Sequence, residues 1–162
     1  MASPTKSAAK RSNAAKPKEA TALLRADHQL VSELFAQFEN TRASLKKKAL
    51  VDQICTALTV HAQVEEEIFY PAFKQAVRDK ELVPEATIKH ATLKALIGHV
   101  EGVQPVGEMY DAKIKVLSEY VKHHVKEEQN EIFPKAISSS LDLVELGVRM
   151  AARKEELMAE RT

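Results

Sequence analysis

The chain has 162 residues, of which 44% are hydrophobic, 5% aromatic and 29% charged, and its formal net charge is +1. This length is sufficient for one domain with a sizeable core and short for two. Gly and Pro are scarce, at four and six residues, and no run alternates β-branched with polar residues between turn dipeptides. The composition therefore argues against a sheet and predicts an all-α body.

The single cysteine, Cys55, excludes an internal disulfide framework and fits a reducing compartment. No apolar run approaches the ~18–20 residues of a membrane span. The N-terminus has no apolar segment behind its Lys and Arg residues, which argues against a secretory signal. We expect a cytoplasmic protein without a membrane segment, in which Cys55 is a small buried side chain rather than a reactive or ligating thiol.

Residues 1–20, MASPTKSAAKRSNAAKPKEA, are expected to form a disordered basic tail ahead of one domain at 21–162. The tail holds five Lys and Arg residues against one Glu, and no residue larger than Met that could start a core. Such a segment cannot bury enough apolar surface to offset the entropy of ordering. Non-specific contact with nucleic acid or an anionic surface is the weaker alternative to a solubilising tail without a partner.

The elements expected after the tail are helices. Residues 19–40 carry apolar residues at helical spacing, with His28 on the same face, and NTRASLKKK provides the first turn. A second helix over residues 46–78 has a stripe that includes His61 and Glu65. Pro71 lies within this helix, where it is expected to kink it or tighten its last turns.

The third helix begins near Pro84 and carries Ile88 and His90 on its inner stripe. The fourth begins near Gly107, and Pro134 is expected to have the same effect on it as Pro71 has on the second helix. After SSS, whose last members suit an N-cap, residues 141–161 are expected to form a shorter amphipathic fifth helix. The short connections predict an up-down-up-down antiparallel four-helix bundle, with the fifth helix across one end or side.

Two stretches of sequence share one pattern, HAQVEEEIFYP at residues 61–71 and HVKEEQNEIFP at 124–134. Each begins with His, has Glu four residues later and ends in Pro six residues after that Glu. His28 lies 33 residues before the first stretch, and His90 lies 34 residues before the second. Each half is therefore a helix with one inward His followed by a helix with His-x-x-x-Glu, which implies two similar half-sites about a pseudo-twofold axis.

The repeated motif directs His and Glu at one spot, because residues four apart on a helix lie ~6 Å apart on the same face. Burying two carboxylates near each other is costly unless a cation lies between them. A pair of metal ions satisfies both and gives neutral imidazoles a role, and mixed nitrogen and oxygen donors suit iron or manganese better than structural zinc. The candidate ligands are His28, His61, Glu65, His90, His124 and Glu128, and the alternative is that these six are satisfied polar residues of the core.

At the segments DHQLV, HAQVEEEIFYP, KHATLKALI and HHVKEEQNEIFP the sequence resembles the hemerythrin-like (HHE cation-binding) family, over roughly residues 21–137 with the fifth helix in keeping. The resemblance implies a four-helix bundle around a non-haem di-iron centre that binds oxygen or a related small oxidant. It implies that His28 and His61 bind one iron, that His90 and His124 bind the other, and that Glu65, Glu128 and an oxo or hydroxo group bridge the two.

One position departs from the family pattern. In oxygen-carrying hemerythrins the third helix supplies two histidines four apart, and here the second of these places holds Lys94. Two histidines per iron leave open positions, which favour peroxide decomposition, peroxide reduction or iron oxidation over reversible oxygen carriage. Lys94 is the candidate catalytic residue, as a cation or proton donor near the site, and the alternative is that it pairs with a carboxylate at the rim.

The sequence thus predicts a di-iron protein for O2, hydrogen peroxide or a similar small oxidant, with catalase- or peroxidase-like activity as one version. Reversible oxygen binding, storage or sensing without turnover is a second version. A third is an iron-responsive interaction module that contacts a partner through the basic tail or the fifth helix.

Two further groups of residues lie near the candidate ligands. Tyr70 and Tyr120 are expected in the core, with a hydrogen bond to the site or phenolate ligation as alternatives. Glu66, Glu67 and Glu127 are expected on solvated faces.

Overall fold

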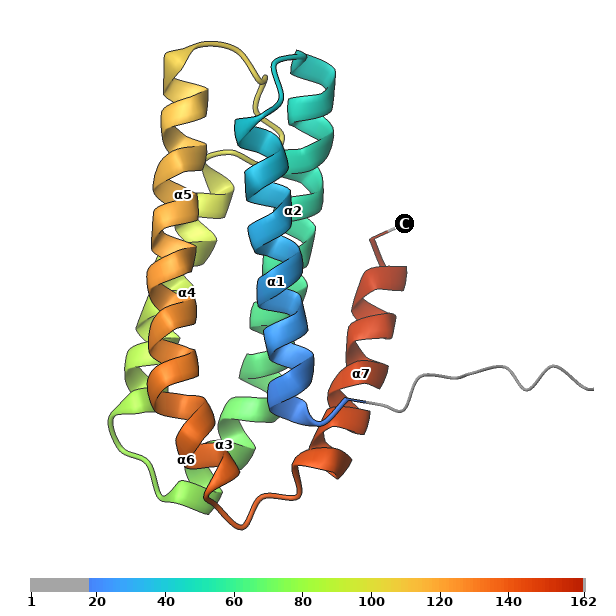
Figure 1. Ribbon diagram of the computed structural model, residues 1–162. Coiled ribbons are helices and arrows are strands. Elements are labelled where there is room, and N and C mark those ends of the chain that lie inside the picture. Colours follow the sequence, from blue (N-terminus) through green and yellow to red (C-terminus); the bar gives the residue numbers. More distant parts are fainter. Residues whose placement is uncertain (1–17, 162) are drawn as a thin grey trace, which may run out of the picture.

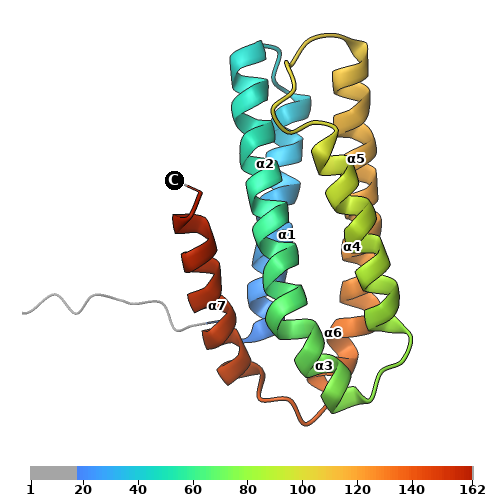
Figure 2. The same ribbon diagram turned by 180° about the vertical axis from the view of Figure 1, so that it is seen from behind.

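Four long helical segments run up and down as an antiparallel bundle in this computed structural model, which describes residues 18–161 (Figure 1). The first helix of each segment is, in chain order, α1 (Ala20–Glu39), α2 (Ser44–Val64), α4 (Leu82–Gly98) and α5 (Glu108–Glu127). Two opposite views place α1 beside α2 and α4 beside α5 (Figures 1 and 2). The prediction of an all-α four-helix bundle is confirmed, while the expected disorder of the tail concerns residues that lie, up to residue 17, outside the described part of the chain.

Two π-helical turns interrupt the long segments. The turn η1 (Glu65–Phe69) leads from α2 into α3 (Tyr70–Val77), and η2 (Glu128–Ile132) leads from α5 into α6 (Phe133–Ile137). Pro71 and Pro134 are the second residues of α3 and α6. A proline has no N–H to donate, and its ring clashes with the carbonyl four residues back, so a wider turn ahead of it removes both conflicts. Pro71 therefore follows a widened turn of the helix. Of the two effects expected of Pro71, a kink or a tightening of the last turns, the tightening was wrong.

A last helix, α7 (Leu143–Ala159), packs along the side of the bundle against α1 and α2 (Figures 1 and 2). Its N-cap is Asp142, whose side chain accepts from the N–H of Glu145 at 3.0 Å, so the expected serine cap was wrong. At Gly147 a Cβ atom would lie 2.3 Å from the carbonyl oxygen of Lys18 and 2.9 Å from the nitrogen of Ala20. Only a glycine lets α7 approach the start of α1 this closely.

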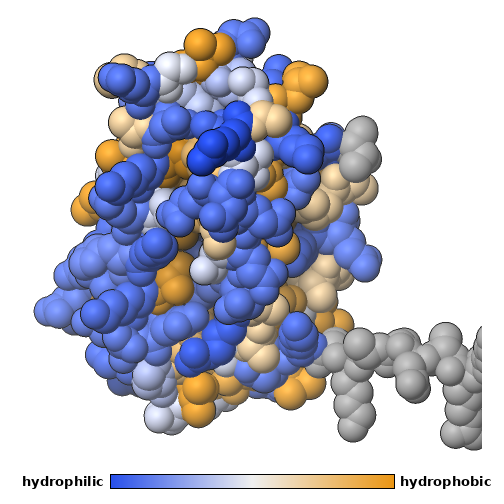
Figure 3. All heavy atoms as spheres, turned by 45° about the horizontal axis from the view of Figure 1, so that its top comes forward, coloured by the Kyte–Doolittle hydropathy of each residue, from blue (hydrophilic) through white to orange (hydrophobic). Residues whose placement is uncertain are grey.

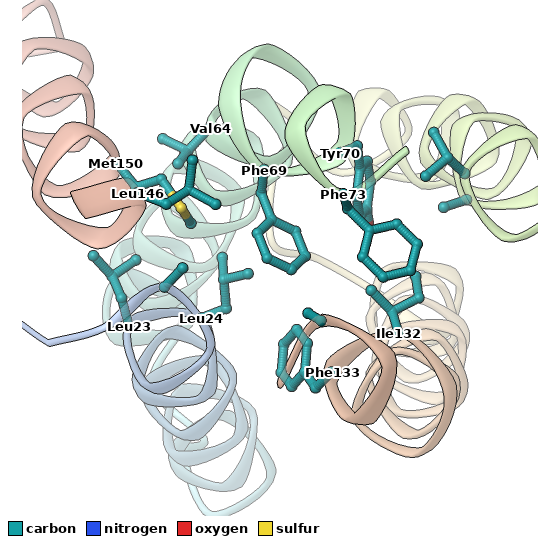
Figure 4. Packing of buried hydrophobic residues seen from close by; sticks show 14 of the residues in the cluster. Leu23, Leu24, Val64, Phe69, Tyr70, Phe73, Ile132, Phe133, Leu146 and Met150 are labelled. Carbon is teal, nitrogen blue, oxygen red and sulfur yellow. The ribbon is translucent and has the colours of Figure 1, made fainter. Parts of the chain in front are cut away.

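The core consists of two apolar clusters, one toward each end of the bundle. Figure 4 shows the first, in which Phe69, Phe73 and Phe133 fill the centre, and Leu146 and Met150 of α7 point toward α1 and α2. The second cluster is built on residues such as Phe35, Ile54, Leu58, Leu93 and Ile114. On α1, α4 and α5 the histidine falls between the stretches that contribute to the two clusters, and His61 of α2 lies one turn past the end of the second cluster, so the fold places the four at mid-height in the bundle.

Two side chains test the expected inner faces. Cys55 is 1% exposed, and burial raises the pKa of its thiol to about 12, as expected for an inert side chain. Ile88, by contrast, is 70% exposed, so its place on the inner stripe of the third helix was wrong.

The outer face is mainly hydrophilic with scattered apolar residues (Figure 3), and none of the helices described at 18–161 combines the length and apolar character needed to cross a membrane.

Candidate metal centre

Six polar side chains meet between the two apolar clusters, and they come from all four long segments. They are His28 of α1, His61 of α2, Glu65 of η1, His90 of α4, His124 of α5 and Glu128 of η2. None is more than 8% exposed, and both glutamates are at most 1% exposed. The two carboxylates are the first residues of the two π-helical turns, which aim them across the bundle at the histidines.

The carboxylate of Glu128 lies between histidines of the two halves. Its Oε1 atom is 3.1 Å from Nε2 of His28 and 4.0 Å from Nε2 of His61, and its Oε2 atom is 3.6 Å from Nε2 of His124. A single carboxylate that reaches histidines on both sides with different oxygens has the arrangement of a bridging ligand.

Glu65 takes the corresponding place in the other half of the repeat. Its Oε1 atom is 2.9 Å from Nε2 of His61 and 3.5 Å from Nε2 of His90. The donor atoms form two groups, each with all its atoms within 4.8 Å of one another: His28, His61 and Glu128 in one, and Glu65, His90 and His124 in the other. This is the pairing of histidines that the family resemblance implies, and the role of these residues as ligands stays a prediction.

Five of the buried donor atoms of the centre have no hydrogen-bond partner in the described part of the chain, whereas Nε2 of His90 and Nε2 of His124 lie 3.2 Å apart. The five atoms are Nε2 of His28, Nε2 of His61, both carboxylate oxygens of Glu65 and Oε1 of Glu128. Nε2 of His61 lies 2.9 Å from Oε1 of Glu65, but no hydrogen bond joins the two atoms. Leaving buried polar atoms unpaired is costly, and a metal ion bound at these lone pairs would remove that cost. The residues present therefore fit the metal that the family implies.

Burial sets the charge state of the imidazoles. It lowers the pKa of His28 to about 3 and that of His124 to about 4, so both rings are neutral at pH 7. The neutral imidazole is the form that binds metal ions. Burial acts in the same direction on His61, but the charge of Glu65 and the hydrogen bond with Asp27 outweigh it and raise the pKa of this ring well above its ordinary value.

The pKa values of the two glutamates shift in opposite directions. Burial acts to raise the pKa of Glu65, but the charge of His61 outweighs it and holds this pKa well below its usual range. Burial and repulsion from Glu65 raise the pKa of Glu128 well above its usual range. Without a cation, the protonated form of Glu128 is therefore favoured, and a bound metal would replace that proton.

Three of the histidines are held by contacts at their outer nitrogen. Nδ1 of His61 is 2.9 Å from Oδ2 of Asp27, Nδ1 of His90 is 3.1 Å from Oε1 of Glu66, and Nδ1 of His28 is 3.0 Å from Nε2 of Gln129. A carboxylate that accepts from Nδ1–H fixes the tautomer in which Nε2 carries the free lone pair. Asp27 was not predicted, and Glu66, expected on a solvated face, is 29% exposed and contacts a candidate ligand.

Tyr70 contacts the centre through its hydroxyl. Its Oη donates to Oε2 of Glu128 at 2.5 Å and lies 3.4 Å from Nε2 of His90. Burial, followed by the nearby carboxylates, raises its pKa well above the ordinary value, so the phenol stays protonated. Of the alternatives for Tyr70, the hydrogen bond is the one that the structure shows. Tyr120 donates instead to the carbonyl oxygen of Lys89 at 3.2 Å.

Lys94 is at the rim of the centre. Its Nζ lies 2.8 Å and 2.9 Å from the two oxygens of Glu66, and its side chain is 52% exposed. Pairing with a carboxylate at the rim was the expected alternative to a catalytic role for Lys94. Lys94 reaches the donor atoms only through Glu66 and the ring of His90.

The fold and the site together define a class: a four-helix bundle whose core holds two His-x-x-x-Glu motifs and two further histidines, as in bundle proteins that bind metal ions through carboxylates and imidazoles. The family model of the hemerythrin HHE cation binding domain matches residues 19–136. The chain therefore belongs to this family.

Two known proteins resemble this chain, one in structure and one in sequence. A hemerythrin HHE cation binding domain-containing protein from Mycobacterium kansasii has a crystal structure that covers 88% of this chain and 89% of its own, with a TM-score of 0.76 and 21% identity. A curated relative, a DNA nickase from Nostoc sp., is 25% identical over 111 residues. That match covers 68% of this chain and 31% of the relative, so this chain spans about a third of the relative's length.

Proposed function

We propose that the six buried side chains hold two iron ions and that the protein uses this centre to handle a small oxidant, with decomposition of hydrogen peroxide as the reaction. One observation carries the proposal: buried imidazole and carboxylate donor atoms without hydrogen-bond partners, arranged as two groups that two carboxylates connect. Nitrogen and oxygen donors without a thiolate favour iron or manganese over zinc. Membership in a cation-binding family supports the metal and leaves its identity to experiment.

The reaction proposed converts two molecules of hydrogen peroxide into two of water and one of oxygen, so that one peroxide is reduced while the other is oxidised. A pair of iron ions, when bound, supplies the redox capacity for this exchange. Each group of donors contributes two histidines and shares the carboxylates with the other, as the distances of Glu65 and Glu128 to both pairs indicate. Fewer histidines per ion leave positions for a substrate, which favours turnover over retention.

The side chains around the donors shape the chemistry. Phe69 and Phe133 are fully buried at the centre of the apolar cluster next to the site, and His28 stacks on Phe133 with ring centroids 5.8 Å apart. These rings keep bulk water from one end of the centre. Tyr70 holds a proton at its Oη atom, directed at Glu128, and is the nearest phenolic proton to the place where a substrate would bind.

A surface groove offers a route to the centre for a small oxidant. It has a volume of about 580 Å³, and its lining includes Tyr70, Glu66, Lys74 and Lys94. Tyr70 lies both in this groove and in hydrogen-bond contact with Glu128, so the groove ends one side chain away from the donor atoms. Lys94 stands at its edge, where we propose that its ammonium group assists substrate entry or proton supply.

The experiment follows oxygen release from hydrogen peroxide with an electrode, using protein loaded with ferrous iron. Wild type is expected to release oxygen over many turnovers, and Glu128→Gln to release none because one carboxylate no longer bridges. The matched control is Glu127→Gln, which changes the adjacent carboxylate, one that pairs with Lys89 at the surface and has no contact with the donor atoms. A stable oxygenated absorption band without turnover would instead support reversible binding or sensing.

A further inference from the structure

Two adjacent cations of α7 connect this helix to the half of the bundle that holds His61. Nζ of Lys154 lies 2.5 Å from Oδ1 of Asp27, whose other oxygen, Oδ2, is 2.9 Å from Nδ1 of His61. Nε of Arg153 lies 2.7 Å from Oε2 of Glu67 in the π-helical turn η1. Lys154 thus ends a chain of contacts that begins at a donor ring, while Arg153 joins α7 to the bundle without touching a donor residue.

Because Asp27 is buried, its carboxylate needs both of its partners, His61 and Lys154. The Asp27 side chain is 9% exposed and its two oxygens serve different partners, His61 on the inside and Lys154 on the outside. A buried carboxylate needs both its charge and its hydrogen-bonding capacity satisfied. If Lys154 is removed, one oxygen of Asp27 loses its partner, and the side chain is then free to turn away from the ring that it orients.

The other half of the centre has a similar chain of contacts from a different source. Nδ1 of His90 contacts Glu66, and Glu66 contacts Lys94. Lys94 stands on α4, four residues after His90 on the same helix, so this connection stays within the bundle. Lys154 stands on α7, which begins after the matched family region of residues 19–136 ends. The two halves share the order histidine, carboxylate, lysine, but only one of them depends on α7.

We propose that Lys154 is a positioning residue for the metal half-site of His61 and that metal binding and the docking of α7 are therefore coupled. The inference rests on the proposed metal centre but not on any peroxide chemistry. A docked α7 holds Asp27, Asp27 fixes the tautomer and orientation of His61, and His61 presents Nε2 to the metal. Coupling of this kind is reciprocal, so a bound metal stabilises the docked α7 by the factor with which docking strengthens metal binding.

The first experiment measures ferrous iron affinity of the full chain by competition with a chelator under anaerobic conditions. Lys154→Met is expected to weaken one of the two ions by about 10-fold, in line with the loss of an outer partner of a ligating histidine. Lys154→Arg, which keeps the charge and a donor for Asp27, is expected to restore most of the affinity. Arg153→Met, which removes the neighbouring ion pair of α7 with Glu67, is expected to change the affinity of neither ion by more than about 2-fold, since this exposed pair contributes little.

The second experiment follows amide hydrogen exchange of α7 with and without ferrous iron, a measurement independent of activity. In wild type the metal is expected to slow exchange in α7, and Lys154→Met is expected to abolish this slowing. Lys94→Met, the matched change in the other half, should leave the response of α7 intact. Two tightly bound ions whose affinities and effect on α7 are unchanged in Lys154→Met would overturn the inference while leaving the metal centre standing. A chain that binds iron but does not consume peroxide would overturn only the proposed reaction.

Discussion

Glu65 and Glu128 occupy equivalent places in the two halves of the bundle: each begins a π-helical turn that ends two residues before a proline. Each also lies close to histidines of both donor groups, Glu65 to His61 and His90, and Glu128 to His28 and His124. The repeated sequence pattern therefore encodes more than the spacing of two ligands. Its proline sets the helical turn that points a carboxylate into the core.

Replacing Glu128 by Gln should stabilise the metal-free protein while it removes the metal site. In the absence of a cation, Glu128 is a fully buried group next to Glu65, and burial together with the charge of Glu65 raises its pKa. A raised carboxyl pKa lowers stability at neutral pH, and the neutral amide keeps the shape without that cost, so the free energy of unfolding at pH 7 is expected to rise by about 1 kcal/mol or more. The measurement is urea denaturation of wild type and variant, both stripped of metal with a chelator.

The control for this change is again Glu127→Gln. Glu127 is a surface residue that pairs with Lys89 and, at 3.1 Å, with Nε2 of His123. Its replacement should alter the free energy of unfolding by less than about 1 kcal/mol, because exposed ion pairs contribute little. Equal stabilities of metal-free wild type and Glu128→Gln would show that burying Glu128 beside Glu65 costs nothing and that no cation is needed between them.

The double change Pro71→Ala and Pro134→Ala should let both long segments close into regular α-helix. Each new N–H can then bond in the α-helical pattern, and the glutamate at the start of each former π-helical turn rotates away from the histidines. We expect the metal-free protein to gain about 1 kcal/mol of stability, by relief of a local irregularity, and to lose at least one metal ion. Pro84→Ala, in the first turn of α4 where proline is tolerated, is the control. Unchanged metal stoichiometry in the double variant would contradict the role given to the prolines.

Gly147→Ala should displace α7 from the start of α1. The added methyl group would lie 2.3 Å from the backbone oxygen of Lys18, and backbone cannot move aside as a flexible side chain can. A cost of about 1–3 kcal/mol in the free energy of unfolding is expected, as for other overpacked positions. Gly98→Ala, at the exposed end of α4 with nothing within 4 Å of the new Cβ, should instead stabilise by about 0.5 kcal/mol. Equal effects of the two changes in thermal denaturation would contradict the close contact of α7 with α1.

Asp79, at the start of α4, should make a pH-dependent contribution to the free energy of unfolding. The carboxylate of Asp79 accepts from the N–H groups of Leu82 at 3.0 Å and Val83 at 2.8 Å. Burial acts to raise the pKa of Asp79, but these bonds hold it below its usual value of 3.8. The contribution is therefore fully present above pH ~3.8 and is lost as the pH falls through the lower, folded value.

Two substitutions of Asp79 check this contribution. Asp79→Ala should cost about 1 kcal/mol at pH 7, as for other capping residues. The difference between wild type and Asp79→Ala should narrow as the pH falls below 3.8. Asp79→Asn, which keeps an acceptor oxygen without the charge, should lose less at pH 7 and show no such narrowing. A difference between wild type and Asp79→Ala that stays constant from pH 7 to pH 3 would contradict the assignment.

Much of the fold and of the centre could be predicted because both depend on periodicity within single helices. His61 and Glu65, four residues apart on an apolar stripe, share a face whatever the rest of the chain does. The repeat of this pattern at His124 then fixed the two halves relative to each other. The same reasoning placed Ile88 inward and failed, since an apolar residue at the edge of a stripe can face solvent with little cost.

Contacts between helices were beyond such reasoning. The bond from Asp27 to His61 joins residues 34 apart, and that from Lys154 to Asp27 joins residues 127 apart. No spacing rule relates these positions, because the first contact depends on how α1 packs against α2 and the second on how α7 lies against the bundle. Asp27 did give a signal, a carboxylate directly before the candidate ligand His28, which could have marked it as a partner. The run of three glutamates at residues 65–67 hid the separate role of Glu66.

We propose that the six side chains form one site for two metal ions. The most direct test is the iron content per folded chain after loading with ferrous iron, measured together with the absorption spectrum in air. Two iron ions per chain in wild type, and a loss of both the iron and the near-ultraviolet band in His61→Ala, are the predicted results. Iron that is absent or substoichiometric in wild type, or unchanged in His61→Ala, would contradict the account.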